Sequence, residues 1–276
     1  MTGSRRETII GHGVLIIAAV IALYPFLSIL SLAMSRPGER PSGVGIPTSL
    51  YFGNFAQAWE RGGFSSALLS SLIVAVAVVA GTLLLTTPAA YALTRGTSKV
   101  LLVLSGLLLL GLVMPYEATV IPLYHMFESW GLLNTYWALI LPQIGLSTSF
   151  AVLWLRVTFT QLPESLTEAA ALDGASRMRT LRSIIVPVTV PALITLGTLL
   201  FLFTWNEFLL ALVLVPDGQT VQTAPLALSF FAGNRRLSDP AVTAAAAVLV
   251  ALPVLVLYLI FQRRLISGML SGAVKE

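Results

Sequence analysis

Cysteine is absent from this sequence, and histidine occurs only twice. The absence of cysteine excludes a disulfide scaffold, a thiolate zinc site and an iron–sulfur cluster. The scarcity of histidine argues against a histidine-rich metal site. We therefore expect neither a metal ion nor a cofactor bound to this chain.

Charged side chains are also scarce. Lys, Arg, Asp and Glu make up 10% of the 276 residues, whereas hydrophobic residues make up 57%. A soluble domain carries about 25% charged residues, so the mean hydropathy of +0.89 indicates a surface that faces a lipid bilayer. This hydropathy excludes soluble enzymes and nucleic-acid-binding modules. The net charge of +4 does not indicate nucleic acid, because it is explained by basic residues that flank membrane spans.

Six of the uncharged stretches between charged residues, 17 to 33 residues long, are candidate membrane spans. About 20 apolar residues suffice to cross a bilayer as a helix, and these stretches lack the alternation of a membrane β-strand. The fold class is therefore an all-α membrane protein, with a single transmembrane domain over residues 1–276. The predicted spans are 11–34, 66–94, 100–116, 135–155, 186–212 and 241–261, and the third is the shortest.

The distribution of Lys and Arg predicts the orientation of these spans. With both termini in the cytoplasm, eleven basic residues fall on the inner side and five on the outer side, as the positive-inside rule requires. Residues 35–65 and 216–240 then form extracytoplasmic loops, and residues 157–187 form a cytoplasmic loop.

The cytoplasmic loop contains the signals of two short helices. Ser165 and Glu168 fit a capping box, Asp173-Gly174 interrupts the helix, and Ser176 can cap a second one. Gly174 after an aspartate predicts a turn with a positive φ. In the second helix one apolar face is shared by Met178, Leu181 and Ile185. Such a pair could bind a groove of a soluble partner or merely cover the inner surface of the bundle.

A resemblance to a known family favours the partner. Glu168-Ala169-Ala170, Gly174, Ile184 and Pro187 resemble the EAA motif in the coupling loop of ABC importer permeases, although Val186 stands where that pattern usually has Leu. Further similarities are Met114-Pro115, Gly131 to Thr135, Trp205-Asn206, Phe261 to Arg264 and Gly272 to Lys275. The chain is most similar to the smaller six-span membrane subunit of maltose-type, binding-protein-dependent carbohydrate importers.

The resemblance implies a type I ABC importer in the inner membrane of a prokaryote. Its partners would be a homologous second permease, a dimer of ATP-binding-cassette ATPases that binds ATP and Mg²⁺, and an extracytoplasmic solute-binding protein; the chain itself would be no enzyme. The coupling residues that it implies are Glu168, Ala169, Ala170, Asp173, Gly174, Arg177, Met178, Leu181 and Pro187.

Two further sites are expected on the outer half. Trp205, Asn206 and Glu207 combine a ring that can stack on a sugar with polar groups that can bind hydroxyls, so they are candidates for the substrate path, although a structural role suits them equally. Gly233, Asn234 and Arg235 occupy the loop that resembles the binding-protein contact of the maltose-type subunit, and an ordinary exposed turn would have the same composition.

The alternative function is an ion-coupled secondary transporter or a channel subunit. Such a protein needs ionisable groups along its ion path, and here only Glu207 approaches the interior of a span. A membrane-embedded enzyme would need paired acids, histidines or a metal cluster, which this sequence does not offer.

Overall fold

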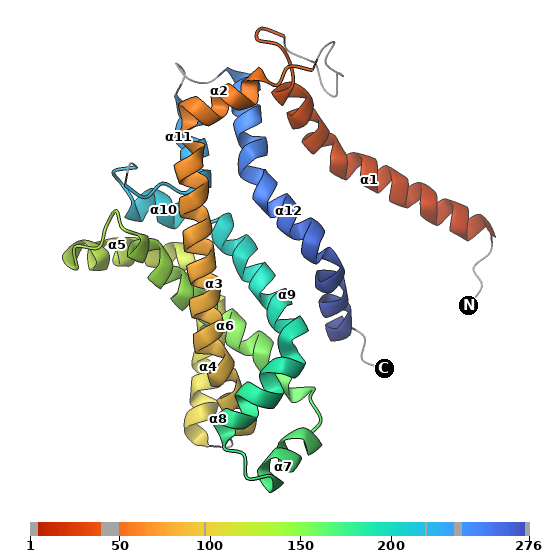
Figure 1. Ribbon diagram of the computed structural model, residues 1–276, viewed down its shortest axis with the longest axis vertical. Helices are drawn as coiled ribbons and strands as arrows, with labels where there is room; N and C mark the ends of the chain where they lie inside the picture. The colour runs from red at the N-terminus through yellow and green to blue at the C-terminus, as the bar shows by residue number, and fades with distance from the viewer. Residues whose placement is uncertain (1–4, 40–49, 97, 219, 235–238, 274–276) are drawn as a thin grey trace. The chain divides into compact units, whose positions relative to one another are not determined.

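The computed structural model describes residues 5–39, 50–96, 98–218, 220–234 and 239–273. The chain divides into two compact units: Met1–Ser66 with Ala227–Pro253, and Ala67–Leu226 with Val254–Glu276. All of the regular structure in the described residues is helical, and Figure 1 shows the course of the chain. Each unit is described by itself below.

The first unit contains α1 (Arg5–Ala33), α2 (Gly53–Gly62), the beginning of α3 (Phe64–Arg95), most of α11 (Ala224–Gly233) and the first part of α12 (Pro240–Ala273). Buried Asn54 joins α2 to the end of α1, because its Nδ2 donates to the carbonyl oxygens of Ala33 at 2.9 Å and Ser35 at 2.8 Å. Phe64 packs edge-on against Phe231, with 5.8 Å between ring centroids. The apolar side chains of α1 are exposed throughout its hydrophobic stretch, as expected of a helix that faces lipid or a partner.

The second unit contains the rest of α3 and the helices from α4 to α10. These are α4 (Lys99–Val113), the 3-10 turn η1 (Tyr116–Thr119), α5 (Val120–Ser129), α6 (Tyr136–Thr160), α7 (Ser165–Leu172), α8 (Arg177–Thr180), the π-helical turn η2 (Leu181–Ile185), α9 (Val186–Trp205) and α10 (Leu209–Leu214). Two apolar clusters hold the unit together, one around Phe127, Leu139 and Leu210, the other around Leu155, Phe159 and Leu200.

Five helical stretches are long and apolar enough to cross a membrane: Ile9–Ala33, Phe64–Arg95, Tyr136–Thr160, Arg177–Trp205 and Pro240–Gln262. The sixth candidate is a pair, Lys99–Val113 with Tyr116–Ser129, bent by 95°. The bend lies at Pro115, which disfavours helical backbone at the preceding residue, and Met114 is extended with ψ 129°. The third expected span, 100–116, thus ends as a helix at Val113.

The fifth span differs from the expected 186–212 at both ends. It begins at Arg177, because the chain runs without a break from α8 through the π turn into α9. Pro187 has no backbone N–H and so donates no hydrogen bond to the helix. The N–H of the preceding Val186 donates to the carbonyl of Leu181, five residues earlier, which is the π-helical pattern. It ends at Trp205, where the Nδ2 of Asn206 donates to the Leu202 carbonyl at 2.7 Å. Such a local side-chain bond competes with continuation of the helix.

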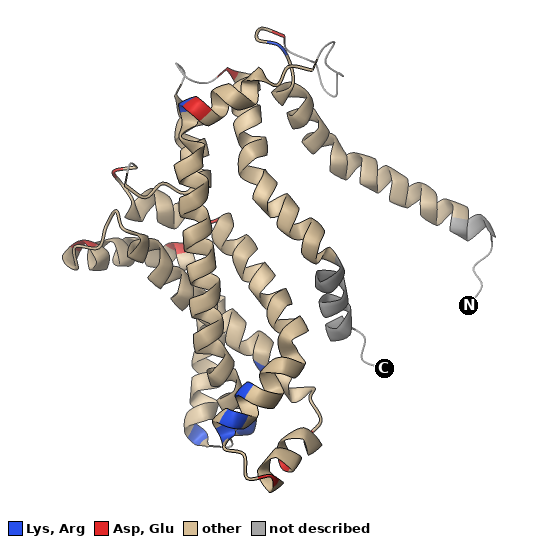
Figure 2. Cartoon of the chain, in the orientation of Figure 1, with Lys and Arg blue, Asp and Glu red and all other residues tan. Residues whose placement is uncertain are grey.

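Basic residues gather at one end of the second unit (Figure 2). Arg95 ends α3, Lys99 begins α4, and Arg177 and Arg179 lie in α8. The turn between α7 and α8 lies at this same end (Figure 1). The unit is therefore electrostatically polar along its length, with its Lys and Arg residues concentrated beside the turn.

Candidate functional sites

The first candidate site is the elbow, which we define as Ser165–Thr180. Helix α7 ends in a left-handed turn: Gly174 has φ 71°, the Ala175 N–H donates to the Ala170 carbonyl at 2.9 Å, and the Gly174 N–H donates to the Ala171 carbonyl at 3.0 Å. This is the Schellman pattern of helix termination. The positive φ expected for Gly174 is confirmed, and no atom lies within 4 Å of the position that a Cβ would occupy there.

The second helix of the elbow starts as predicted and the first does not. The Oγ of Ser176 accepts the N–H of Arg179 at 3.4 Å, so Ser176 is the N-cap. The capping box at Ser165 and Glu168 is wrong, because Glu164 is the N-cap of α7 and makes no side-chain cap bond. The chain enters this helix through Pro163, whose carbonyl accepts the Leu166 N–H at 3.3 Å, and this places Ser165 inside the first turn.

Two large apolar residues of the elbow are exposed, whereas two of the π turn that follows it are buried. Leu172 is 89% exposed and Met178 is 48% exposed, whereas Leu181 and Ile185 are buried in the apolar cluster around Phe159. The face expected to be shared by Met178, Leu181 and Ile185 is therefore available to a partner only at Met178, because Leu181 and Ile185 pack into the bundle. The π turn packs Leu181 and Ile185 into the apolar cluster of the bundle. Leu181 therefore anchors the C-terminal end of the elbow and is not free to contact a partner.

Most of the other expected coupling residues are accessible. Glu168, Ala169, Asp173, Gly174, Arg177 and Pro187 are exposed, and Ala170 is buried. Sequence reasoning missed Leu172, although its position directly before the Asp173-Gly174 break was a usable signal. The elbow is joined to the bundle by an ion pair between Arg95 and Glu164 at 4.0 Å, in which the glutamate is mostly exposed and the bond is correspondingly weak.

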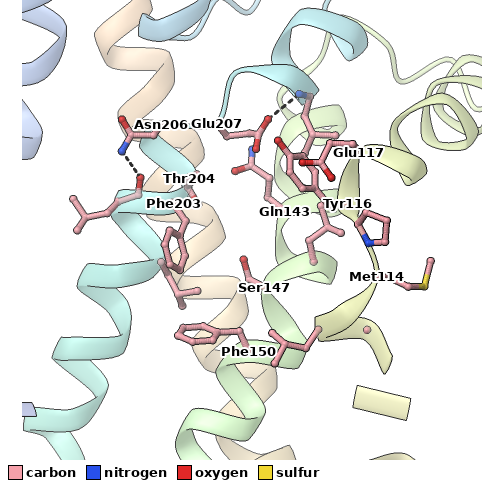
Figure 3. A pocket seen from close by; sticks show the side chains of 17 residues that line it. Met114, Tyr116, Glu117, Gln143, Ser147, Phe150, Phe203, Thr204, Asn206 and Glu207 are labelled. Atoms are coloured by element: carbon pink, nitrogen blue, oxygen red, sulfur yellow. Dashed lines mark hydrogen bonds between the residues drawn. The ribbon is translucent and has the colours of Figure 1, made fainter. Parts of the chain in front are cut away.

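The second candidate site is a cavity of about 650 Å³ in the second unit. Its walls come from the end of α4, η1, the outward half of α6 and the region where α9 gives way to α10 (Figure 3). The polar or aromatic residues that line it are Tyr116, Glu117, Gln143, Ser147, Phe150, Phe203, Thr204, Asn206 and Glu207. Hydroxyl, amide and aromatic groups in an open cavity suit a hydroxyl-bearing ligand.

Only two of the three expected substrate-path residues line this cavity. Asn206 and Glu207 do so, whereas Trp205 is 3% exposed and stacks on Phe201 with ring centroids 5.4 Å apart. The role of Trp205 as a sugar-stacking residue is therefore wrong, because its ring is packed inside the bundle. The aromatic rings that do line the cavity are those of Phe150 and Phe203, whose centroids are 5.9 Å apart.

Sequence reasoning did not identify Gln143, Ser147 and Phe150. Their spacing of four and three residues places them on one face of α6, and this polar and aromatic stripe in an otherwise apolar span was the available signal. Gln143 is buried, and its Nε2 donates to the Leu139 carbonyl at 3.0 Å. Glu207 accepts the N–H of Leu210 at 2.9 Å and so starts α10.

The expected binding-protein contact lies in the first unit. Gly233 is the last residue of α11, and the N–H of the following Asn234 donates to the Phe231 carbonyl at 3.3 Å. Arg235 lies outside the described residues. The loop expected over residues 216–240 therefore contains a helix that ends at Gly233.

Long apolar helices, a basic end that carries an exposed elbow, and an open polar cavity define a multi-pass permease subunit. Residues 84–271 match the family described as binding-protein-dependent transport system inner membrane component, and this chain belongs to that family. It is a transport subunit of the inner membrane. Family membership also decides against an ion-coupled carrier and against an enzyme.

Similar proteins agree with this assignment. The chain is 36% identical to the trehalose transport system permease protein SugB of Mycobacterium tuberculosis, over 92% of this chain and 93% of that protein. It is 32% identical to the trehalose/maltose transport system permease protein MalG of Thermococcus litoralis, over 98% and 99%. A chain of a bacterial ABC transporter that imports the acidic polysaccharide alginate has the same fold, with a TM-score of 0.81 and 23% identity over 95% and 99% of the two chains.

Proposed function

We propose that this chain is one of two permease subunits of a sugar importer, and that it couples an ATPase subunit at the elbow to a solute in the cavity. The observation that carries the proposal is the unbroken helical run Arg177–Trp205. At one end it begins in the elbow, and at the other it supplies Phe203 and Thr204 to the cavity.

A continuous helix can transmit a displacement over its whole length. At 1.5 Å per residue, 29 residues span about 43 Å, so a movement at α8 is felt where α9 ends. Leu181 and Ile185 are packed into the bundle, so the elbow cannot move without moving this helix and its neighbours. Coupling also requires that the ATPase binds the elbow differently in two states of the importer.

The elbow offers the features that a groove of a soluble partner would bind. Leu172 projects almost fully into solvent, and Met178 lies half exposed beyond the turn. Arg177 and Arg179 flank them. An exposed leucine between short helices is an anchor for a hydrophobic groove, and the concentration of Lys and Arg at this end supports a cytoplasmic position for the elbow.

The proposed orientation also suggests where the remaining partners would bind. The second permease and lipid would cover the exposed apolar faces, such as α1. The extracytoplasmic binding protein would present the solute, and Gly233 and Asn234 of the first unit are candidates for its contact. Sugar as the solute class is supported by the names of the relatives and by the hydroxyl, amide and aromatic lining of the cavity.

The test is Leu172→Asp in the assembled importer, with Leu172→Met as the matched control. Burying a leucine side chain stabilises a complex by about 1.5–3 kcal/mol, so we expect Leu172→Asp to lower retention of the ATPase subunit on co-purification by tenfold or more. ATP hydrolysis stimulated by trehalose or maltose on the binding protein should fall with it. The methionine variant should behave as wild type, because it keeps an apolar side chain of similar volume.

The folding control is the thermal stability of the chain. Leu172 contacts almost nothing within the subunit, so neither variant should change its melting temperature by more than a degree or two. Full stimulation of ATP hydrolysis by Leu172→Asp would refute docking at the elbow.

A further inference from the structure

The charged groups that line the cavity are all of one sign. Glu117 and Glu207 are both carboxylates, and no Lys, Arg or His is among the lining residues. Figure 3 shows the two side chains at the same end of the cavity, with Tyr116 and Gln143 beside them. Glu207 is held there by the bond from the Leu210 N–H to its Oε1, so one of the two charges has a fixed position.

Gln143 adds an acceptor that no group of the protein satisfies. The side chain is 93% buried, and its Nε2 donates to the Leu139 carbonyl. Among the described residues no donor reaches its Oε1. An amide oxygen that faces a cavity without a partner costs free energy unless a ligand or water donates to it. The end of the cavity that holds the carboxylates therefore presents three acceptor groups beside the Tyr116 hydroxyl, and it favours a solute group that donates hydrogen bonds.

We propose that Glu117, Glu207 and Gln143 make this cavity a charge filter. It admits neutral or amine-bearing polyhydroxylated solutes and rejects anionic ones, such as sugar phosphates and uronic acids. This inference rests on the proposed function, because it assumes that the solute passes through the cavity. The hydroxyl groups of a neutral sugar donate to the three acceptors, whereas a phosphate or carboxylate brings further acceptors and a like charge to the same place.

The electrostatic effect is large enough to select solutes. A cleft lined by one sign of charge, with low-dielectric walls, changes the local concentration of ions of either sign by about tenfold or more. A binding protein can select a solute before it reaches the membrane, but the filter acts on whatever is released into the cavity. The permease would thus impose a second, independent selection by charge.

The absence of cysteine from the chain allows a direct test with a single introduced thiol. Ser147→Cys places a sulfur of nearly the same size in the cavity wall. The assembled importer in proteoliposomes is treated with a cationic methanethiosulfonate (the trimethylammonium ethyl reagent) or an anionic one (the sulfonatoethyl reagent). Each rate is divided by the rate of the same reagent with 2-mercaptoethanol, which removes the intrinsic difference between the reagents.

We expect the normalised cation-to-anion ratio at Ser147→Cys to be about tenfold or more. Glu117→Gln and Glu207→Gln should each lower it, and the double variant should bring it to within about twofold of unity. Glutamine keeps an oxygen that can accept the Leu210 N–H, so the start of α10 is retained. The matched control is Ser129→Cys on the exposed end of α5, where the two glutamine substitutions should leave the ratio unchanged.

Two results would overturn the filter. One is a ratio near unity at Ser147→Cys that the glutamine variants do not alter, and the other is a thiol that neither reagent reaches, since a filter must be open to the aqueous solute. Both can be told apart from failure of the proposed function, which is measured through Leu172→Asp and ATP hydrolysis. A working importer with an equal response to both reagents refutes the charge filter alone.

Discussion

The elbow and the cavity lie at opposite ends of the same helical run and are built in opposite ways. The elbow consists of consecutive residues, and its shape follows from hydrogen bonds between near neighbours, such as the N–H of Ala175 to the carbonyl of Ala170. The cavity is assembled from three distant segments, 111–117, 143–150 and 200–210. The elbow can therefore be predicted from local sequence, whereas the cavity forms only when α4, α6 and α9 pack together.

The two sites also break the ordinary rule of burial in opposite directions. At the elbow a large apolar side chain, Leu172, is exposed, and in the cavity a polar side chain, Gln143, is buried with an acceptor unsatisfied. Both arrangements cost free energy in the isolated subunit. Each is relieved by something outside the chain, an apolar groove in one case and a donor group in the other. Exposed large apolar residues and buried polar residues of this kind indicate where a subunit binds a partner or a solute.

The largest loss of stability is expected at Trp205, which is buried next to the cavity-lining residue Asn206. It distinguishes residues of the interior from residues that line the cavity. Trp205→Ala should destabilise the subunit by about 3–5 kcal/mol, because the ring is buried against Phe201. Its neighbour Asn206→Ala removes a cavity-lining group and should cost much less stability. Thermal unfolding of both variants in detergent measures the difference. If Trp205→Ala keeps its melting temperature and loses only transport, the ring belongs to the substrate path after all.

The next effect concerns the backbone of the elbow. Gly174→Val forces a β-branched residue to φ 71°, and left-handed backbone costs about 1–2 kcal/mol for a residue with a Cβ. We expect the turn to change shape and solute-stimulated ATP hydrolysis to fall by tenfold or more, with membrane insertion intact. Gly174→Asn is the matched control, because asparagine tolerates this conformation. The space around the position is open, so equal loss in both variants would contradict a conformational role.

The smallest effect is expected at the helix cap of the elbow. Ser176→Ala removes the acceptor for the Arg179 N–H and should destabilise the start of α8 by about 1 kcal/mol. Ser176→Asp keeps an acceptor and should retain wild-type behaviour. Faster hydrogen exchange of the Arg179 amide in the alanine variant alone would verify the cap. An unchanged exchange rate would show that the π turn and the bundle hold the elbow without it.

The sequence predicts a large part of the fold because charge is so costly in a bilayer. Uncharged stretches mark the spans, and Gly174 and Ser176 mark the turn, since each acts on atoms within a few residues of itself. The failures lie where packing decides. Leu181 is assigned to a partner but packs inward in the apolar cluster that contains Phe159, and Trp205 is assigned to the solute but stacks on Phe201.

The composition and order of residues by themselves determined a helical membrane protein and a turn with a left-handed glycine, and the Lys and Arg count predicted its orientation. These properties depend on the cost of charge in hydrocarbon and on local backbone geometry, both of which are readable along the chain. The tertiary structure alone decided which side chains surround the cavity and which apolar residues stay exposed at the elbow. Such facts depend on contacts between segments far apart in the sequence, where no local preference sets which face of a helix meets its neighbour.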